Sequence, residues 1–203
     1  MIQAHLAATV KGFPVFVHTI DHADGIVLVD TGMIDSTPEL DDEWQPVPHP
    51  ENVPRDVVCV INTHLHFDHC GGNRLFAGVP IHVQRRELAD ARDRDDYTVR
   101  RWVDFPEAAY VEHDGEVDVL PGVRLLPTPG HTAGHQSVLV DTPSGPVVLG
   151  GDVAYTFREL GIGATEGQRR VLELGAPTWL AHAERPKIPI RTGAEPPSRA
   201  RSS

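Results

Sequence analysis

Three histidines and an aspartate fall within six positions of the stretch Thr63-His64-Leu65-His66-Phe67-Asp68-His69. If the histidines and aspartates of the chain were scattered at random, roughly 0.003 matches to this H-x-H-x-D-H pattern would be expected. In an extended chain His64 and His66 point the same way, whereas Asp68 and His69 can reach a second point around the following turn. This spacing predicts two adjacent metal sites and disfavours the alternative, surface histidines in a polar loop.

Two further stretches can complete the shells of two metal ions, because one local cluster offers too few ligands. The first is Pro127-Thr128-Pro129-Gly130-His131-Thr132-Ala133-Gly134-His135, whose prolines and glycines fix a loop that carries histidines. The second is Leu149-Gly150-Gly151-Asp152, where an apolar strand ends in an aspartate whose two oxygens can bridge two cations.

Buried strands are expected to deliver these residues. Val57–Ile61 is short and β-branched, so it is interpreted as a buried strand with Thr63 at its end, where chemistry collects in α/β proteins. Gly71 and Gly72 are expected to bend the backbone after the histidines. Val15–Ile20 and Ile26–Val29 predict a β-hairpin. Further strands are predicted at Pro80–Gln84, Gly122–Leu126, Gln136–Asp141, Pro146–Leu149 and Thr178–Ala181.

Helices are predicted at Arg85–Arg94 and Thr165–Leu174. The charges of the first helix are assigned no specific role. Asp35–Arg55 contains five prolines and no periodic apolar face, which predicts a long loop bordering a site. Strands interleaved with helices in both halves predict an α/β fold with two packed sheets or one covered sheet.

Length and composition favour a single domain over residues 1–186, followed by a disordered tail over 187–203 that is rich in Pro, Arg, Gly and Ser. The start of the chain has no signal-peptide pattern and no stretch is long enough to cross a bilayer, so a soluble protein with no membrane partner is expected. Two cysteines favour a cytoplasmic location. The formal charge of −11 argues against nucleic acid as a partner.

The motifs carry a family resemblance, which extends from about Val15 to about His182. The histidine stretch, Pro129–His135 and Gly151-Asp152 resemble the metallo-β-lactamase superfamily. Within it, the chain is most similar to the N-acyl-homoserine lactonases, through His64–Asn73, Gly134–Ser137, Asp152–Thr156 and Asp30–Met33. The resemblance implies a four-layer αββα sandwich with the metals at one edge of the two sheets.

The same resemblance implies a set of metal ligands. His64, His66 and His131 would hold one metal, and Asp68, His69 and His182 the other, with Asp152 bridging them. His182 lies between two alanines, whereas related sequences usually place glycine before this histidine and often aspartate after it, so a plain buried histidine is the alternative. His135 and Asp30 would orient ligands without touching metal. The other six histidines are assigned surface or packing roles: His5, His18, His22, His49, His82 and His113.

The implied chemistry is hydrolysis of an ester ring in a small lactone or ester. Ligands of nitrogen and oxygen suit two divalent ions, Zn²⁺ first and Fe, Mn or Co as alternatives. Two cations sharing a water would lower its pKa from 15.7 toward about 7 and supply a hydroxide that attacks the carbonyl. Tyr155 would stabilise the oxyanion, the alternative being a tyrosine at the edge of the core, and Asp68 would pass a proton to the leaving alkoxide.

Other functions share parts of this pattern. A thioesterase resembling hydroxyacylglutathione hydrolase, a sulfur dioxygenase with one iron and a non-catalytic metal-binding relative are the alternatives. A β-lactam substrate is disfavoured because no cysteine occupies a ligand position. The segments after Met33 and between Asp152 and His182 are shorter than in typical lactonases, which leaves the substrate less defined than the metal chemistry. The sequence does not specify an oligomeric state.

Overall fold

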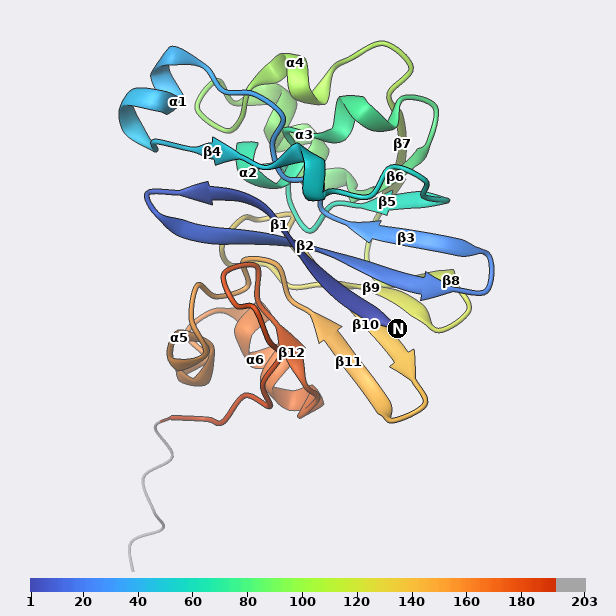
Figure 1. Ribbon diagram of the computed structural model, residues 1–203. Coiled ribbons are helices and arrows are strands. Elements are labelled where there is room, and N and C mark those ends of the chain that lie inside the picture. Colours follow the sequence, from blue (N-terminus) through green and yellow to red (C-terminus); the bar gives the residue numbers. More distant parts are fainter. Residues whose placement is uncertain (193–203) are drawn as a thin grey trace, which may run out of the picture.

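Twelve strands form two β-sheets in the computed structural model, which describes residues 1–192 (Figure 1). In sheet order, the larger consists of β4 (Val47–Pro48), β1 (Ile2–Val10), β2 (Phe13–His22), β3 (Gly25–Val29), β5 (Cys59–Ile61), β6 (Pro80–Gln84) and β7 (Ala109–His113). The smaller consists of β12 (Thr178–Trp179), β11 (Gly145–Leu149), β10 (Gln136–Thr142), β9 (Val123–Pro127) and β8 (Val117–Leu120).

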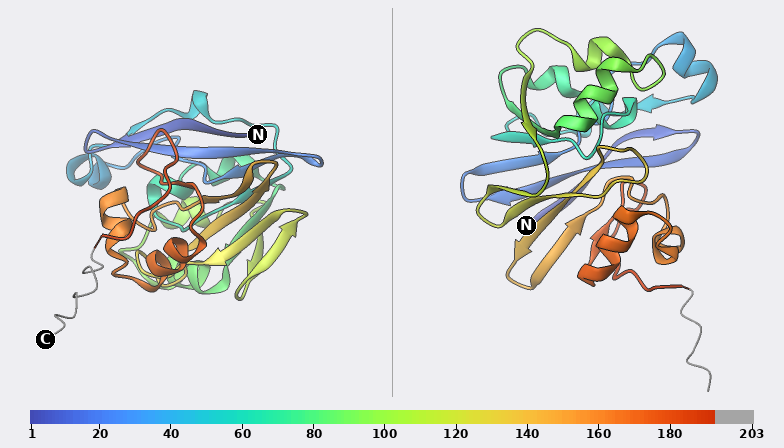
Figure 2. Two further views of the ribbon diagram at one scale, coloured as in Figure 1. Left: turned by 90° about the horizontal axis from the view of Figure 1, so that it is seen from below. Right: turned by 180° about the vertical axis from the view of Figure 1, so that it is seen from behind.

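Helices lie on the outer side of each sheet, and the view from behind shows the resulting layers (Figure 2). On the side of the larger sheet are α1 (Pro38–Glu43), η1 (Pro50–Asn52), α2 (Phe67–Cys70), η2 (Asn73–Phe76), α3 (Arg85–Asp93) and α4 (Arg100–Val103). On the side of the smaller sheet are α5 (Phe157–Ile162) and α6 (Glu166–Leu174). The αββα sandwich expected from the sequence is therefore confirmed.

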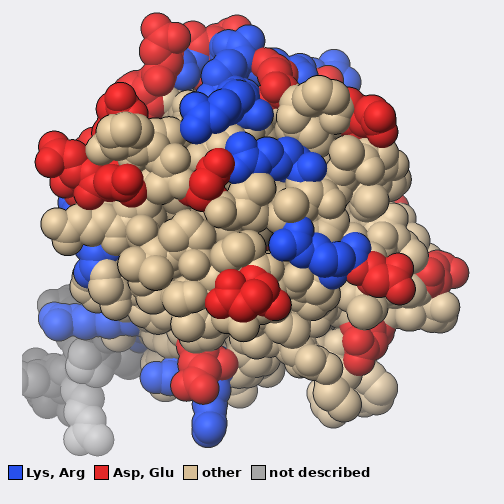
Figure 3. All heavy atoms as spheres, turned by 45° about the horizontal axis from the view of Figure 1, so that its top comes forward, with Lys and Arg blue, Asp and Glu red and all other residues tan. Residues whose placement is uncertain are grey.

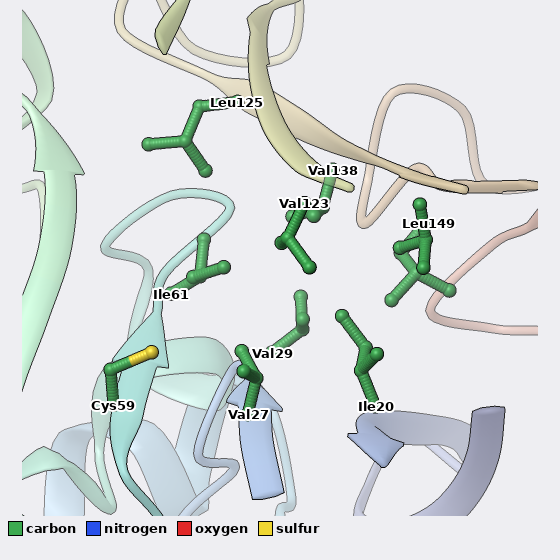
Figure 4. Packing of buried hydrophobic residues seen from close by; sticks show 10 residues of the cluster. Ile20, Val27, Val29, Cys59, Ile61, Val123, Leu125, Val138 and Leu149 are labelled. Carbon is green, nitrogen blue, oxygen red and sulfur yellow. The ribbon is translucent and has the colours of Figure 1, made fainter. Parts of the chain in front are cut away.

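The main core fills the space between the two sheets (Figure 4). Alternate residues of a strand face opposite sides of a sheet, so the β-branched runs direct one row of side chains inward. Ile20, Val27 and Ile61 of the larger sheet pack against Val138 and Leu149 of the smaller one. This packing fixes the strand ends from which the polar loops leave.

Those ends meet at one edge of the sandwich. β3 and β5 are parallel, so Asp30 and Thr63 leave the larger sheet together, and the Asp30 N–H donates to the Ile61 carbonyl. The Gln136 N–H at the start of β10 donates to the Thr63 carbonyl and ties the smaller sheet to the same point. Gly71 and Gly72 lie in a turn, as expected, but both have a negative φ, so the turn itself does not require glycine; a Cβ at Gly72 would lie 2.4 Å from the Thr31 carbonyl oxygen. Gly72 permits close approach of two loops.

The predicted hairpin and the remaining predicted strands and helices are present, with ends shifted by up to two residues. The prediction of a loop over Asp35–Arg55 was partly wrong, because this segment contains α1, β4 and η1. The side chain of Thr37 caps α1, and Pro38 occupies its first turn, where the missing N–H costs nothing. The sequence did not predict β1, β7, β8 or α5.

Part of the segment after residue 186 contacts the domain. The Lys187 N–H donates to the Thr178 carbonyl, the Thr178 N–H donates back, and the Thr192 N–H donates to the Gly161 carbonyl. Residues 193–203 of the predicted tail lie outside the described residues. None of the helices among residues 1–192 combines the length and apolar character that a bilayer crossing requires.

Candidate metal centre

Three histidines from two loops form the first cluster. His64 and His66 follow β5, and His131 lies in the loop after β9. One nitrogen of each lies within 4.8 Å of the others, and His66 Nδ1 is 3.0 Å from His131 Nε2. Burial lowers the pKa of all three, to about 3 for His66. The three imidazoles are therefore neutral at pH 7 and keep lone pairs for a metal.

The second cluster adjoins the first and contains carboxylates. His69 Nε2 lies 3.5 Å from Asp152 Oδ1, and His182 Nε2 lies 3.3 Å from the same oxygen. Asp68 Oδ2 is 3.8 Å from His69 Nε2. The other oxygen of Asp152 is 3.8 Å from His131 Nε2, so this carboxylate stands between the two clusters.

The spacing and burial of these atoms fit a pair of divalent cations. Ligands bound at 2.0–2.1 Å in a tetrahedral site stand about 3.3 Å apart; the individual pairs measured above are separated by 3.0 to 3.8 Å, and the three nitrogens of the first cluster lie within 4.8 Å of one another. His64 Nε2, His69 Nε2 and Asp152 Oδ1 are buried without any hydrogen-bond partner. Leaving such atoms unpaired is unfavourable, and two cations, one bound by His64 and the other by His69 with Asp152 between them, would satisfy all three.

Opposite charges shape the second cluster. Burial disfavours a charged His69, but the carboxylates of Asp152, Asp68 and Asp30 outweigh it and hold the pKa of His69 well above its usual value. Burial also disfavours a charged Asp152, yet His69 and His182 hold the pKa of Asp152 well below its usual value. Without a cation, His69 therefore binds a proton more readily than an ordinary histidine, and Asp152 less readily than an ordinary aspartate.

Asp30 contacts His69, a proposed ligand histidine of the kind that the family resemblance led us to expect it to orient. Its Oδ2 lies 2.8 Å from His69 Nδ1 and accepts from the Thr63 hydroxyl at 2.8 Å, while its Oδ1 accepts from the Thr63 N–H at 2.7 Å. With Nδ1 donating to the carboxylate, Nε2 of His69 faces the centre as the free nitrogen. Asp30 reaches this position with a φ of +62°.

His182 reaches the same cluster from the far end of the chain. Its Nδ1 lies 2.7 Å from the Pro14 carbonyl oxygen on β2, which leaves Nε2 directed at Asp152. The Ala181 N–H donates to the Gly151 carbonyl and fixes the backbone beside it. The segment after the short strand β12 therefore places a histidine beside Asp152.

His135 and Tyr155 flank the first cluster. His135 Nδ1 lies 2.9 Å from the Thr128 hydroxyl, and the Thr128 N–H donates to the His135 carbonyl, which closes the loop that carries His131. The Tyr155 hydroxyl is 3.4 Å from His131 Nδ1. Tyr155 is 51% exposed, so it belongs to the cavity and not to the core.

A cavity of about 910 Å³ opens above the two clusters. His66, Asp68, His131, Asp152 and His182 form part of its lining. Apolar side chains from the β1–β2 hairpin, from α1 and the residue after it, from α2 and from the residue before α4 form much of the remainder: Val10, Phe13, Leu40, Trp44, Phe67 and Val99. The centre therefore faces a space large enough for a small molecule with an apolar part.

Glu87 was missed by the sequence analysis, which assigned no role to the charges of its helix. It is fully buried and accepts hydrogen bonds from the Leu65 N–H, the Tyr97 hydroxyl and the Thr132 hydroxyl. The available signal was an acid in the first turn of a helix that starts directly after a buried strand. Like the proposed ligands, Glu87 lies shortly after the end of a strand.

The histidines to which the sequence gave surface or packing roles lie outside both clusters. His82 Nδ1 lies 2.9 Å from His113 Nε2, and His5 contacts the Thr19 hydroxyl. His18 is buried with its ring edge against Trp179.

Comparisons with known proteins agree with this geometry. Residues 10–177 match the family model described as the metallo-beta-lactamase superfamily. An N-acyl homoserine lactonase from a Bacillus species is 38% identical over an alignment of 164 positions, which covers 70% of this chain and 65% of that relative. The lactonase AiiA of Bacillus thuringiensis subsp. kurstaki is 37% identical with the same coverage. The chain thus spans about 65% of the length of these curated relatives.

Solved structures give a corresponding result. A mutant of AiiA from B. thuringiensis with N-decanoyl-L-homoserine at its active site superposes with a TM-score of 0.74 at 27% identity, covering 89% of this chain and 91% of that chain. An N-acyl homoserine lactone hydrolase with its product, N-hexanoyl-L-homoserine, at the catalytic metal centre superposes with a TM-score of 0.70 at 26% identity and the same coverage.

Proposed function

The chain belongs to the metallo-β-lactamase superfamily, and from this premise we propose that it is a metal-dependent hydrolase that opens N-acyl-homoserine lactones or related lactones. The observation that carries the proposal is the convergence of two ligand clusters on the floor of a partly apolar cavity, with their buried lone pairs unsatisfied. Relatives that match this chain bear the name N-acyl homoserine lactonase, which supports the substrate class.

In this proposal His64, His66 and His131 hold one divalent ion, Asp68, His69 and His182 hold the other, and Asp152 lies between them. When bound, two such ions would polarise an ester carbonyl and lower the pKa of a water molecule held between them. Zn²⁺ is the proposed ion because the donors are imidazole nitrogens and carboxylate oxygens, which Fe, Mn and Co also accept. Elemental analysis of the protein as isolated tests the choice.

Tyr155 is proposed to donate a hydrogen bond to the oxyanion that develops on the carbonyl oxygen. Burial, with the nearby charges of Asp152, Asp68 and Glu159, raises the pKa of Tyr155 to about 12. The phenol therefore keeps its proton at neutral pH. Its exposed hydroxyl borders the cavity beside His131, where a substrate carbonyl can reach it.

Asp68 is proposed to carry the proton that the leaving alkoxide needs. Its side chain borders the cavity, with Oδ2 3.8 Å from His69 Nε2, so it lies within reach of both the proposed second ion and a bound substrate. Because ring opening moves a proton from water to the departing oxygen, a carboxyl at the cavity floor can serve as the intermediate acceptor.

Small molecules are the proposed partners, and nucleic acid is not. The cavity has the size of a small-molecule site, and the net charge of −11 would repel a phosphate backbone. On the face displayed in Figure 3, acidic and basic side chains are interspersed. A cytoplasmic location is proposed from the two cysteines, both of which are free thiols.

A lactone panel on protein of measured metal content tests the proposal. Ring opening releases acid, so a pH indicator should report turnover of acyl-homoserine lactones and its loss when metals are removed by a chelator. Turnover of thioesters with no turnover of any lactone would contradict the proposed substrate and favour the glutathione thioesterase alternative. A single iron per chain would favour the dioxygenase alternative.

A further inference from the structure

Glu87 is a buried acidic residue on a helix that otherwise carries its charges at the surface. It stands in the first turn of α3, is fully buried, and binds three donors with its two oxygens. A buried carboxylate is costly unless it is fully hydrogen-bonded. Each of its three donors therefore contributes to keeping this carboxylate in the interior.

Two of the donors belong to the two loops that supply the first cluster. Leu65, whose N–H binds Oε1 at 2.8 Å, lies between His64 and His66. Thr132, whose hydroxyl binds Oε2 at 2.7 Å, directly follows His131. The carboxylate therefore links two loops that come from different sheets.

The third donor supports a ligand ring. The Tyr97 hydroxyl donates to Glu87 Oε1, and the ring of Tyr97 lies with its centroid 5.1 Å from that of His66. Tyr97 is buried and also lines the cavity. Glu87 thus reaches His66 in two ways, through the Leu65 backbone and through the Tyr97 ring.

Gly134 is independent support for this link. A Cβ at Gly134 would lie 2.3 Å from the Glu87 nitrogen and 2.5 Å from its Cα. Only glycine allows the loop that carries His131 to press against the start of α3 this closely. The loop that carries His131 therefore contacts Glu87 through its backbone at Gly134 as well as through the Thr132 side chain.

The second cluster has a different support. Asp30 binds Thr63 and His69, and the Pro14 carbonyl binds His182. We propose that Glu87 is the positioning residue of the first metal site, holding His66 and His131 at the separation a cation needs, as Asp30 does for His69. The inference rests on the proposed function only through the existence of two metal sites.

The test measures metal binding and not turnover. Metal-free protein is titrated with Zn²⁺ against a competing chelator, and two binding steps are expected for the parent. His131→Ala and His182→Ala identify which step belongs to which site. In Glu87→Gln the step that is lost in His131→Ala should weaken tenfold or more, and the other step should stay within about threefold.

Graded variants separate positioning from folding. Glu87→Gln keeps the shape and an acceptor oxygen, so it should retain more first-site affinity than Glu87→Ala. Thr132→Val, which removes one donor, should weaken the same step. Asp90→Asn on the same helix, where Asp90 pairs with Arg86, is the matched control and should bind both metals as the parent does.

Two results would overturn the inference. One is parental affinity for both metals in Glu87→Gln and Glu87→Ala. The other is an equal weakening of both steps accompanied by a lower melting temperature of the metal-free variant, which indicates a general loss of structure. A parent that binds no metal at all would overturn the proposed function as well, so the two failures are distinguishable.

Discussion

The hydroxyl of Tyr155 lies at the border between ligand cluster and cavity, 3.4 Å from His131 and open to solvent. Removing it should leave the metal ligands in place and remove one donor to the oxyanion. For Tyr155→Phe we predict a fall in kcat/KM of tenfold or more with two metals retained, since one positioned donor can contribute about 3 kcal/mol in the transition state. Kinetics on one lactone with parallel metal analysis checks this; activity equal to the parent would refute the role.

The histidines of the two clusters differ in how readily they bind protons. His69 and His182 have raised pKa values because of neighbouring carboxylates, whereas burial lowers those of His64, His66 and His131. Ligand histidines must be deprotonated. At neutral pH, loading the second site should therefore release protons and loading the first should release few.

The direction of each pKa shift determines how the metal affinity of each site changes with pH. As the pH falls, protons on His69 and His182 compete with the cation, so the affinity of the second site should weaken first. Calorimetric titration in two buffers of different ionisation enthalpy measures the protons released at each step. Equal proton release at both steps would contradict the assignment.

The proposed ligands could be chosen from the sequence because they lie in short motifs at strand ends. His64, His66 and His69 share one such stretch, and Asp152 follows two glycines after the strand β11. The roles of Glu87 and of the Pro14 carbonyl could not be predicted from the sequence, because they arise from contacts between segments far apart in the chain. Spacing along the sequence contains no signal for them.

Among the elements, those with a strong apolar period were predictable and those built on local capping were not. β5 is a fully buried apolar run, β11 ends in the apolar run Val147-Val148-Leu149, and α6 presents buried Val171 on one face. α1 has no buried residue and depends on a Thr37 cap and a proline in its first turn. β7 and β8 are mostly half-buried, so their patterns are weak.

The unpredicted α1 and the β1–β2 hairpin together form one wall of the cavity. The Lys11 N–H donates to the Trp44 carbonyl, the Lys11 ammonium lies 4.3 Å from the centre of the Trp44 ring, and that ring tilts against Phe67 at 5.9 Å. These contacts hold Trp44 as an apolar surface above the metal centre. An acyl chain on a substrate would bury its methylenes here.

Trp44→Ala should therefore act on long acyl chains and spare short ones. Each buried methylene contributes about 0.8 kcal/mol, so loss of contact with two of them lowers kcat/KM roughly tenfold. Lactones with four and ten acyl carbons, assayed in parallel, provide the comparison. Val47→Ala, an exposed position on neighbouring β4, is the control, and an equal loss on both lactones would contradict the wall assignment.

The molecule as a whole makes the centre by joining its two sheets. The larger sheet supplies Asp30 and the histidines after β5, and the smaller supplies His131, Asp152 and His182. The Phe16 N–H donates to the Ala181 carbonyl and links β2 to the segment that carries His182. The sequence indicated an α/β fold, but the pairing of the sheets entered through the family resemblance, because strand patterns do not specify which strands become neighbours.

Anomalous diffraction from crystals grown with Zn²⁺ tests the central claim, a pair of cations at the junction of the two sheets. We predict two peaks per chain, one among His64, His66 and His131 and the other beside Asp68, His69 and His182, with Asp152 between them. A single peak, or two peaks that leave Asp152 or His131 without a metal neighbour, would contradict the account.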